Sequence, residues 1–229
     1  RDFLATRLRR STEDFALGWL GTWVDRPTRD REALVNAVDL DWYPRSAVAV
    51  QARAMRSDLR DGSIDSIGYG ATAAFRYQPG GSLSQQVEVV WLDDDFNVND
   101  LGYQERADVR RITSDTTLYR RSYPEGHWLS ASQWGIKGGA FWNQQGQGLP
   151  GWLELRRGLN LRNGDSLTFG AWHEFSGIDD RITRGNGDLH LGDGGGAWIH
   201  WKQAESGPGR LDVEANLRRE SLGGSAWEL

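Results

Sequence analysis

Three observations predict an all-β chain that folds as an antiparallel, up-and-down transmembrane β-barrel. Apolar and polar residues alternate over stretches of ten or more residues, the period of a strand with two different faces. The connections between these stretches alternate between short and long, as tight turns and longer loops do in outer-membrane barrels. The 229-residue chain is rich in Gly (29) and Trp (12), has no Cys, and is only 38% hydrophobic. That fraction is low for a packed core but sufficient for a barrel with one apolar face.

The alternation predicts about twelve strands. They cover residues 1–11, 14–24, 32–43, 47–57, 66–78, 82–93, 108–122, 127–143, 151–162, 166–176, 195–205 and 210–221. Several exceed the ~5–6 residues that are usual in globular sheets and match the ~9–11 residues of a tilted membrane strand. Trp and Tyr fall near strand ends, as in the aromatic girdles of membrane barrels: Trp23, Trp42, Tyr43, Tyr77, Trp91, Tyr123, Trp128, Trp142, Trp152 and Trp201.

In the N-terminal half, each predicted strand gathers its apolar side chains on one face. In order, these sets are Phe15, Leu17, Trp19, Gly21 and Trp23; Val48, Val50, Ala52 and Ala54; Tyr69, Ala71, Ala73, Phe75 and Tyr77; and Val87, Val89 and Trp91. The opposite faces carry polar groups such as Gln51, Arg53, Arg76 and Glu88. The last strand of this set is the least regular, because Val90 and Leu92 lie on its polar side.

The C-terminal strands repeat the pattern. Leu153 and Leu155 oppose Glu154 and Arg156; Ala197, Ile199 and Trp201 oppose Trp198, His200 and Lys202; Leu211, Val213, Ala215 and Leu217 oppose Asp212, Glu214, Asn216 and Arg218. Charges of both signs at successive positions of one face predict ion pairs inside a lumen, with Arg53, Arg76, Arg156 and Arg218 as partners of Glu88, Glu154, Glu174 and Glu214.

The connections follow the expected order. Short ones are predicted at 11–14, 44–46, 79–81, 123–126, 163–165 and 207–209, and longer ones at 25–32, 57–65, 93–108, 143–149 and 177–193. No sequence repeat has a fixed period, which argues against a propeller or a solenoid. We expect a single domain over 1–229. The first residues read as the middle of a strand and the last ones as the start of another, so we expect a fragment of a larger barrel.

Composition excludes several classes of function. The net charge is −5, and the basic residues form no patch, so we expect no nucleic-acid partner. The mean hydropathy of −0.62 and the lack of long apolar runs exclude a transmembrane helix. No phosphate-binding loop, nucleophile elbow or cysteine nucleophile is present, and we expect no cofactor.

One stretch of about fifteen residues, 95–109, resembles a family signature. It is similar to a pattern in bacterial envelope proteins that carry an N-terminal carbohydrate-binding family 9-like domain and a C-terminal outer-membrane β-barrel. The matching positions are Phe96, Val98, Asn99, Asp100, Leu101, Gly102, Arg106 and Asp108, with Tyr103 where the family usually has Phe. The resemblance implies the bacterial outer membrane as location and implies no catalytic residue.

The residue types in the loop around this signature also indicate how it folds. Asn99, Asp100 and Gly102 favour a compact turn, while Phe96, Val98, Leu101 and Tyr103 can pack the loop on itself or into the lumen. We therefore predict an ordered loop that carries the specific contacts of this region, with Phe96, Asn99, Asp100, Leu101, Gly102, Tyr103, Arg106 and Asp108 as binding residues.

Two acidic segments hold residue types that bind metals. Asp188, His190 and Asp193, near His173, are candidate metal ligands, although their spacing matches no zinc or EF-hand pattern. The run 93–95 could bind calcium or the cations that bridge lipopolysaccharide. A solvated acidic loop is the simpler interpretation of both segments.

These observations predict a non-enzymatic outer-membrane barrel that handles or transports glycan, or anchors an upstream carbohydrate-binding domain. Two alternatives stay open: a barrel hydrolase acting on lipid or polysaccharide through paired carboxylates, and a membrane anchor subunit of an envelope complex. The expected partners are outer-membrane lipid, glycan or lipopolysaccharide, and other envelope proteins.

Overall fold

The computed structural model describes residues 2–100, 102, 104, 106–183, 186–204, 211–220 and 222–228. The described chain is all-β, with one short 3-10 turn, η1 (Pro27–Arg29). None of its helical segments has the length and apolar character needed to cross a bilayer.

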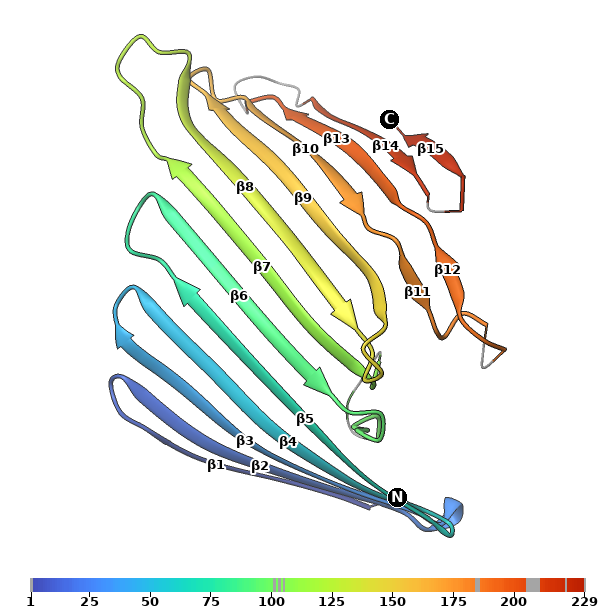
Figure 1. Ribbon diagram of the computed structural model, residues 1–229. Helices are drawn as coiled ribbons and strands as arrows, with labels where there is room; N and C mark the ends of the chain where they lie inside the picture. Colours follow the sequence, from blue (N-terminus) through green and yellow to red (C-terminus); the bar gives the residue numbers. More distant parts are fainter. Residues whose placement is uncertain are drawn as a thin grey trace. The chain divides into compact units, whose positions relative to one another are not determined.

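Thirteen strands form one antiparallel sheet in which chain order is also spatial order, apart from the insertion of β11 and β12 (Figure 1). They are β1 (Asp2–Ser11), β2 (Phe15–Arg26), β3 (Arg31–Arg45), β4 (Val48–Asp61), β5 (Ile64–Tyr77), β6 (Leu83–Leu92), β7 (Val109–Arg120), β8 (Leu129–Trp142), β9 (Gly148–Leu161), β10 (Ser166–Glu174), β13 (Gly194–Lys202), β14 (Asp212–Arg219) and β15 (Ser225–Glu228). The strands β11 (Gly177–Asp179) and β12 (Leu189–Leu191) pair as a separate hairpin.

All twelve predicted strands are present, and β11, β12 and β15 are additions, the first two within the connection predicted at 177–193. The sheet order begins at β1 and ends at β15, and no pairing joins these two strands among the described residues. The predicted all-β antiparallel class is therefore confirmed, while the closed transmembrane barrel stays a prediction.

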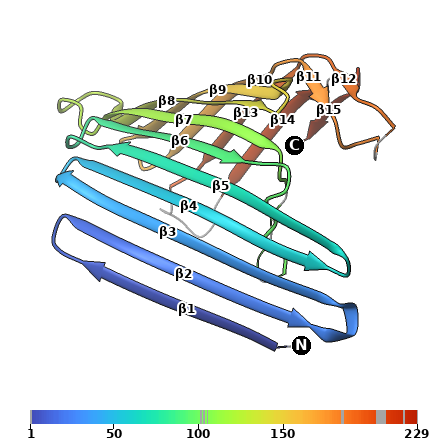
Figure 2. The ribbon, with the colours of Figure 1, turned by 60° about the horizontal axis from the view of Figure 1, so that its bottom comes forward.

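The chain divides into two compact units. Unit 1 comprises 1–76, 87–112 and 142–147; unit 2 comprises 77–86, 113–141 and 148–229. In unit 1, β1 to β5 lie side by side as a ladder of long antiparallel strands (Figure 2).

Two of the predicted connections are wrong in length. Residues 57–65 are not a loop, because β4 runs on to Asp61 and meets β5 through Gly62 and Ser63, where Gly62 adopts a φ of 62°. The charged segment 58–61 has the composition of a loop, yet its residues pair with the start of β3. The connection predicted at 123–126 extends over eight residues, 121–128. The predicted turn 207–209 lies outside the described residues.

Register places the apolar sets of neighbouring strands on the same face. In unit 1, Leu17 pairs with Leu40, and Leu40 pairs with Ala52. In unit 2, Phe169 pairs with Ile199, and Ile199 pairs with Ala215. We call this side of each unit its apolar face and the other side its polar face.

Much of the apolar face is exposed. Its exposed large side chains in unit 1 include Leu4, Leu8, Phe15, Leu17, Leu34, Val38, Trp42, Ile67, Tyr69, Phe75, Val89 and Trp91; in unit 2 they include Leu118, Trp134, Ile136, Leu153, Leu155, Phe169, Ile199, Val213, Leu217 and Trp227. The small core of unit 1 lies instead on the polar face, at Ala16, Val24, Ala33, Ala37, Val90 and Phe96.

Candidate functional site

The β6–β7 loop, residues 93–108, folds onto the polar face of unit 1. Phe96 is 3% exposed, and a Cβ at Gly68 of β5 would overlap the backbone of Phe96. The Asn97 amide donates to Ser57 Oγ of β4 at 3.0 Å, and Ser57 is 1% exposed. Glycine in β5 thus lets the loop approach the strand closely. Burial of Phe96 contributes about 1.5–3 kcal/mol.

Arginines at the end of the β2–β3 hairpin hold the loop through Asp100, which is 8% exposed. Arg31 Nη2 donates to Asp100 Oδ2 at 2.9 Å, and its Nε lies 3.1 Å from Oδ1. Arg26 Nη2 donates to the Asp100 backbone oxygen at 3.1 Å and lies 3.2 Å from Oδ1. Two-pronged guanidinium–carboxylate contacts are strong and geometrically specific.

Gln104 organises the interior of the loop. Its Oε1 accepts from the Val98 amide at 3.2 Å, and its Nε2 donates to the Phe96 carbonyl at 2.9 Å and to the Arg106 carbonyl at 3.2 Å. The Gln104 amide donates to Asn99 Oδ1 at 2.8 Å. One side chain therefore satisfies three backbone groups that form no sheet hydrogen bonds, which keeps an irregular segment compact.

The remaining signature residues close the loop. Gly102 N donates to the Val98 carbonyl at 2.9 Å, and Arg106 Nε donates to the Asp108 carbonyl at 3.1 Å. Asp108, with a φ of 52°, accepts from the Gln144 amide of the β8–β9 turn. The burial of Phe96 agrees with the predicted ordered loop, whereas Leu101 and Tyr103 lie outside the described residues.

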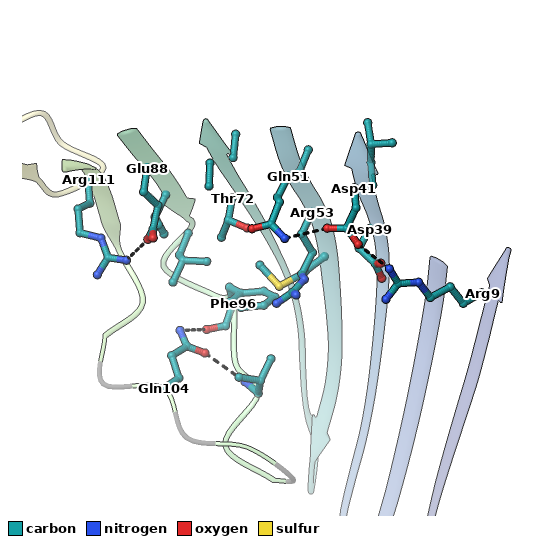
Figure 3. A pocket seen from close by; sticks show the side chains of 18 of the residues that line it. Arg9, Asp39, Asp41, Gln51, Arg53, Thr72, Glu88, Phe96, Gln104 and Arg111 are labelled. Atoms are coloured by element: carbon teal, nitrogen blue, oxygen red, sulfur yellow. Dashed lines mark hydrogen bonds and ion pairs between the residues drawn. The ribbon is translucent and has the colours of Figure 1, made fainter. Parts of the chain in front are cut away.

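A pocket of about 640 Å³ opens between this loop and the charged strands of unit 1 (Figure 3). Loop side chains Phe96, Val98 and Gln104 line it, together with Arg7, Arg9, Asp39, Asp41, Gln51, Arg53, Thr72, Glu88 and Arg111 from the polar face. We call it the polar-face pocket.

The strands place charges in this pocket as cross-strand rows. Arg7 of β1 pairs with Asp39 of β3. Arg9 Nη2 pairs with Asp41 Oδ2 at 2.9 Å, and Asp41 Oδ1 accepts from Gln51 Nε2 at 2.8 Å. Donors and acceptors thus alternate along the rows, an arrangement suited to a hydroxyl-rich solute. Such exposed pairs each contribute only about 0.2–1 kcal/mol to stability.

The predicted ion pairs exist with other partners. Glu88 contacts Arg111 at 2.6 Å, Arg156 contacts Asp115 at 3.1 Å, and Arg218 lies 3.8 Å from Glu220. The predicted partners of Glu88, Arg156 and Arg218 are therefore wrong, because sharing a face does not by itself decide which charged side chains meet.

Carboxylates of the acidic segments accept hydrogen bonds from backbone amides. Asp93 Oδ2 accepts from the Tyr69 amide at 2.7 Å, and Asp193 Oδ1 accepts from the Ser176 amide at 2.7 Å. In the part of the chain that the structure describes, no three His, Asp or Glu side chains lie close enough to hold a metal ion. Asp188, His190 and Asp193 accordingly form no such group.

Sequence reasoning missed Gln104, Arg26, Arg31 and Ser57 as parts of this site. No feature of the sequence near these residues indicates their roles, because each role depends on a contact that forms only when the loop docks on the sheet. No protein-family model matches the chain, and no curated protein or solved structure is significantly similar to it. The resemblance of 95–109 to the envelope family therefore stays a prediction.

Proposed function

We propose that this chain forms part of the wall of a non-enzymatic β-barrel in the bacterial outer membrane. Its apolar face lies against lipid, and its polar face lies toward a water-filled lumen. The order of the sheet supports this proposal, because consecutive strands pair as in an up-and-down barrel.

The single observation that carries the proposal is the exposed apolar face. Soluble proteins rarely expose contiguous apolar surface beyond a few hundred Å². In unit 2, the row Phe169, Ile199 and Ala215 crosses three strands, and Leu217 is 61% exposed beside Trp227. Lipid would remove this surface from water without any change in the fold.

The polar-face pocket supports a role in contacting glycan within the lumen. Its guanidinium, carboxylate and amide groups offer both donors and acceptors. Sugars present hydroxyls that need both kinds of partner. The buried Phe96 and the half-buried Val98 of the loop contribute to the apolar part of its lining, together with strand residues such as Met55 and Leu92.

A cysteine scan tests the membrane assignment, because the chain contains no native Cys. The full protein would be expressed in a Gram-negative host and reconstituted with a fluorophore at single cysteines along β14. Brominated lipid should quench labels at Val213, Ala215 and Leu217, and water-soluble quencher should reach labels at Asp212, Glu214 and Asn216. Equal access of water to both sets, or absence of the protein from the membrane fraction, would overturn the proposal.

A further inference from the structure

The connection 121–128 and the adjoining ends of β7, β8 and β9 form a basic aromatic cluster in unit 2. Arg120 lies over the Tyr123 ring at 4.0 Å, and Arg157 lies over the Trp134 ring at 4.6 Å. Tyr123 stacks on His127 at 4.3 Å, and His127 on Trp128 at 6.1 Å. Each arginine therefore lies against an aromatic ring.

The two arginines continue the apolar face. Alternation along β7 places Arg120 on the side of Leu118, and alternation along β9 places Arg157 on the side of Leu153 and Leu155. Arg156, on the opposite side of β9, contacts Asp115. The cluster thus combines positive charge with exposed apolar surface, since Trp128 and Trp134 are 60% and 56% exposed.

Two further arginines at this end of unit 2 donate hydrogen bonds to backbone carbonyls. Arg162 donates to the carbonyls of His127 at 2.7 Å, Tyr123 at 3.0 Å and Pro124 at 2.6 Å. Arg121 donates to the Gly81 carbonyl. Within the described part of the chain, no carboxylate pairs with any of these four arginines.

This arrangement contrasts with other arginines of the sheet. Those that pair with a carboxylate include Arg7, Arg9, Arg31, Arg111, Arg156 and Arg218. The acidic residue of the connection itself, Glu125, is exposed and forms no ion pair with any other residue that the structure describes. The cluster therefore keeps a surplus of positive charge.

Tyr123, the ring beneath Arg120, is held in place within the cluster. Its hydroxyl lies 2.8 Å from Ser132 Oγ, and Ser132 is buried. The hydrogen bond to Ser132 lowers the pKa of Tyr123, and the neighbouring Arg157 and Arg120 lower it further, against the opposing effect of desolvation. The ring that supports Arg120 is thus held against β8 and does not swing freely.

We propose that Arg120 and Arg157 bind the phosphate of an anionic lipid headgroup, with Trp128 and Trp134 beside its acyl-chain boundary. The inference rests on the proposed membrane location. Guanidinium groups suit phosphate because they present paired donors in one plane. Aromatic side chains prefer the level of the headgroups, where their rings can be apolar on one side and wet on the other.

The experiment uses the full protein in detergent with an equimolar mixture of phosphatidylglycerol and phosphatidylcholine, and native mass spectrometry measures the retained lipid. Wild type should retain phosphatidylglycerol preferentially. Each Arg→Gln change at Arg120 or Arg157 should reduce that preference about fivefold, which corresponds to about 1 kcal/mol per basic residue at a membrane surface. Arg→Lys changes at the same positions should restore most of it.

Arg218→Gln is the matched control, because Arg218 also lies over an aromatic ring, Trp172, but faces the polar side and has Glu220 nearby. Its lipid preference should equal that of wild type. The proposed site would be overturned if the Arg120→Gln, Arg157→Gln double variant kept the preference for phosphatidylglycerol. It would also be overturned if inorganic phosphate alone displaced the lipid. If wild type retains both lipids equally while the cysteine scan shows that it inserts into the membrane, this inference is overturned and the proposed function stands. Failure to insert would refute the proposed function itself.

Discussion

Arg31, the first residue of β3, binds the carboxylate of Asp100 across 69 residues of sequence, with Nη2 2.9 Å from Oδ2. Arg26 completes the contact from the end of β2. This carboxylate, buried between two guanidinium groups, links the β2–β3 hairpin to the β6–β7 loop and helps to hold that loop on the polar face.

Asp100→Asn should release the loop. The change leaves the partly buried Arg26 without its carboxylate and Arg31 with Asp61 alone, and breaking a buried pair costs about 3–5 kcal/mol. Some of that cost is relieved by solvent, so we expect the amides of 96–100 to exchange about a hundredfold faster, as measured by hydrogen exchange. Asp94→Asn, at an exposed position of the same loop, should leave exchange unchanged. Equal exchange in the two variants would contradict the role of Asp100.

Gly68→Ala should displace the loop from β5. The added Cβ would overlap the backbone of Asp95 and Phe96, which cannot move as easily as a side chain. Overpacking of this kind costs about 1–3 kcal/mol. Limited proteolysis should cut within 93–108 in the variant before it does so in wild type. Gly148→Ala is the control, because no atom lies near its added Cβ; similar cleavage in both variants would argue against close contact at Gly68.

Gln104→Ala should loosen the loop without unfolding the sheet. The variant loses an acceptor for Val98 and donors for Phe96 and Arg106, and each buried group left unsatisfied costs about 1–3 kcal/mol. The Val98 amide should therefore exchange at least tenfold faster while amides in β2 and β3 stay protected. Gln78→Ala removes only an exposed hydrogen bond to Ser84 and should behave as wild type. A slow Val98 amide in the Gln104 variant would show that other contacts define the loop.

Ile199→Arg should destabilise the protein in a lipid bilayer. A charged residue on the lipid-facing side costs about 2–4 kcal/mol at the bilayer midplane. Denaturant unfolding in liposomes would measure the change. His200→Arg, the neighbouring position on the polar face beside Asp212, places a cation next to a carboxylate and should cost under about 1 kcal/mol. Equal effects at the two positions would contradict a lipid-facing apolar face.

Local alternation along the chain was enough to locate the long strands and the apolar side of each. The alternation in 14–24 and 210–221 is a local signal, since successive side chains of a strand point to opposite faces whatever the neighbours are. The exceptions do not show the strand pattern: 58–61 is charged like a loop, and the strands at 177–179, 189–191 and 225–228 are too short to show a period.

Which side chains meet across the sheet follows from the folded arrangement of the strands and not from local pattern. Glu88 pairs with Arg111 and Arg156 with Asp115 because strand register sets the cross-strand neighbours, and register depends on the whole sheet. The site was predictable at Phe96 and Asp100, whose residue types stand out in a long loop. Arg31, Ser57 and Gln104 were not predictable, because their roles arise only when the loop docks on a strand at Gly68, where the absence of a side chain makes room for the backbone of Phe96.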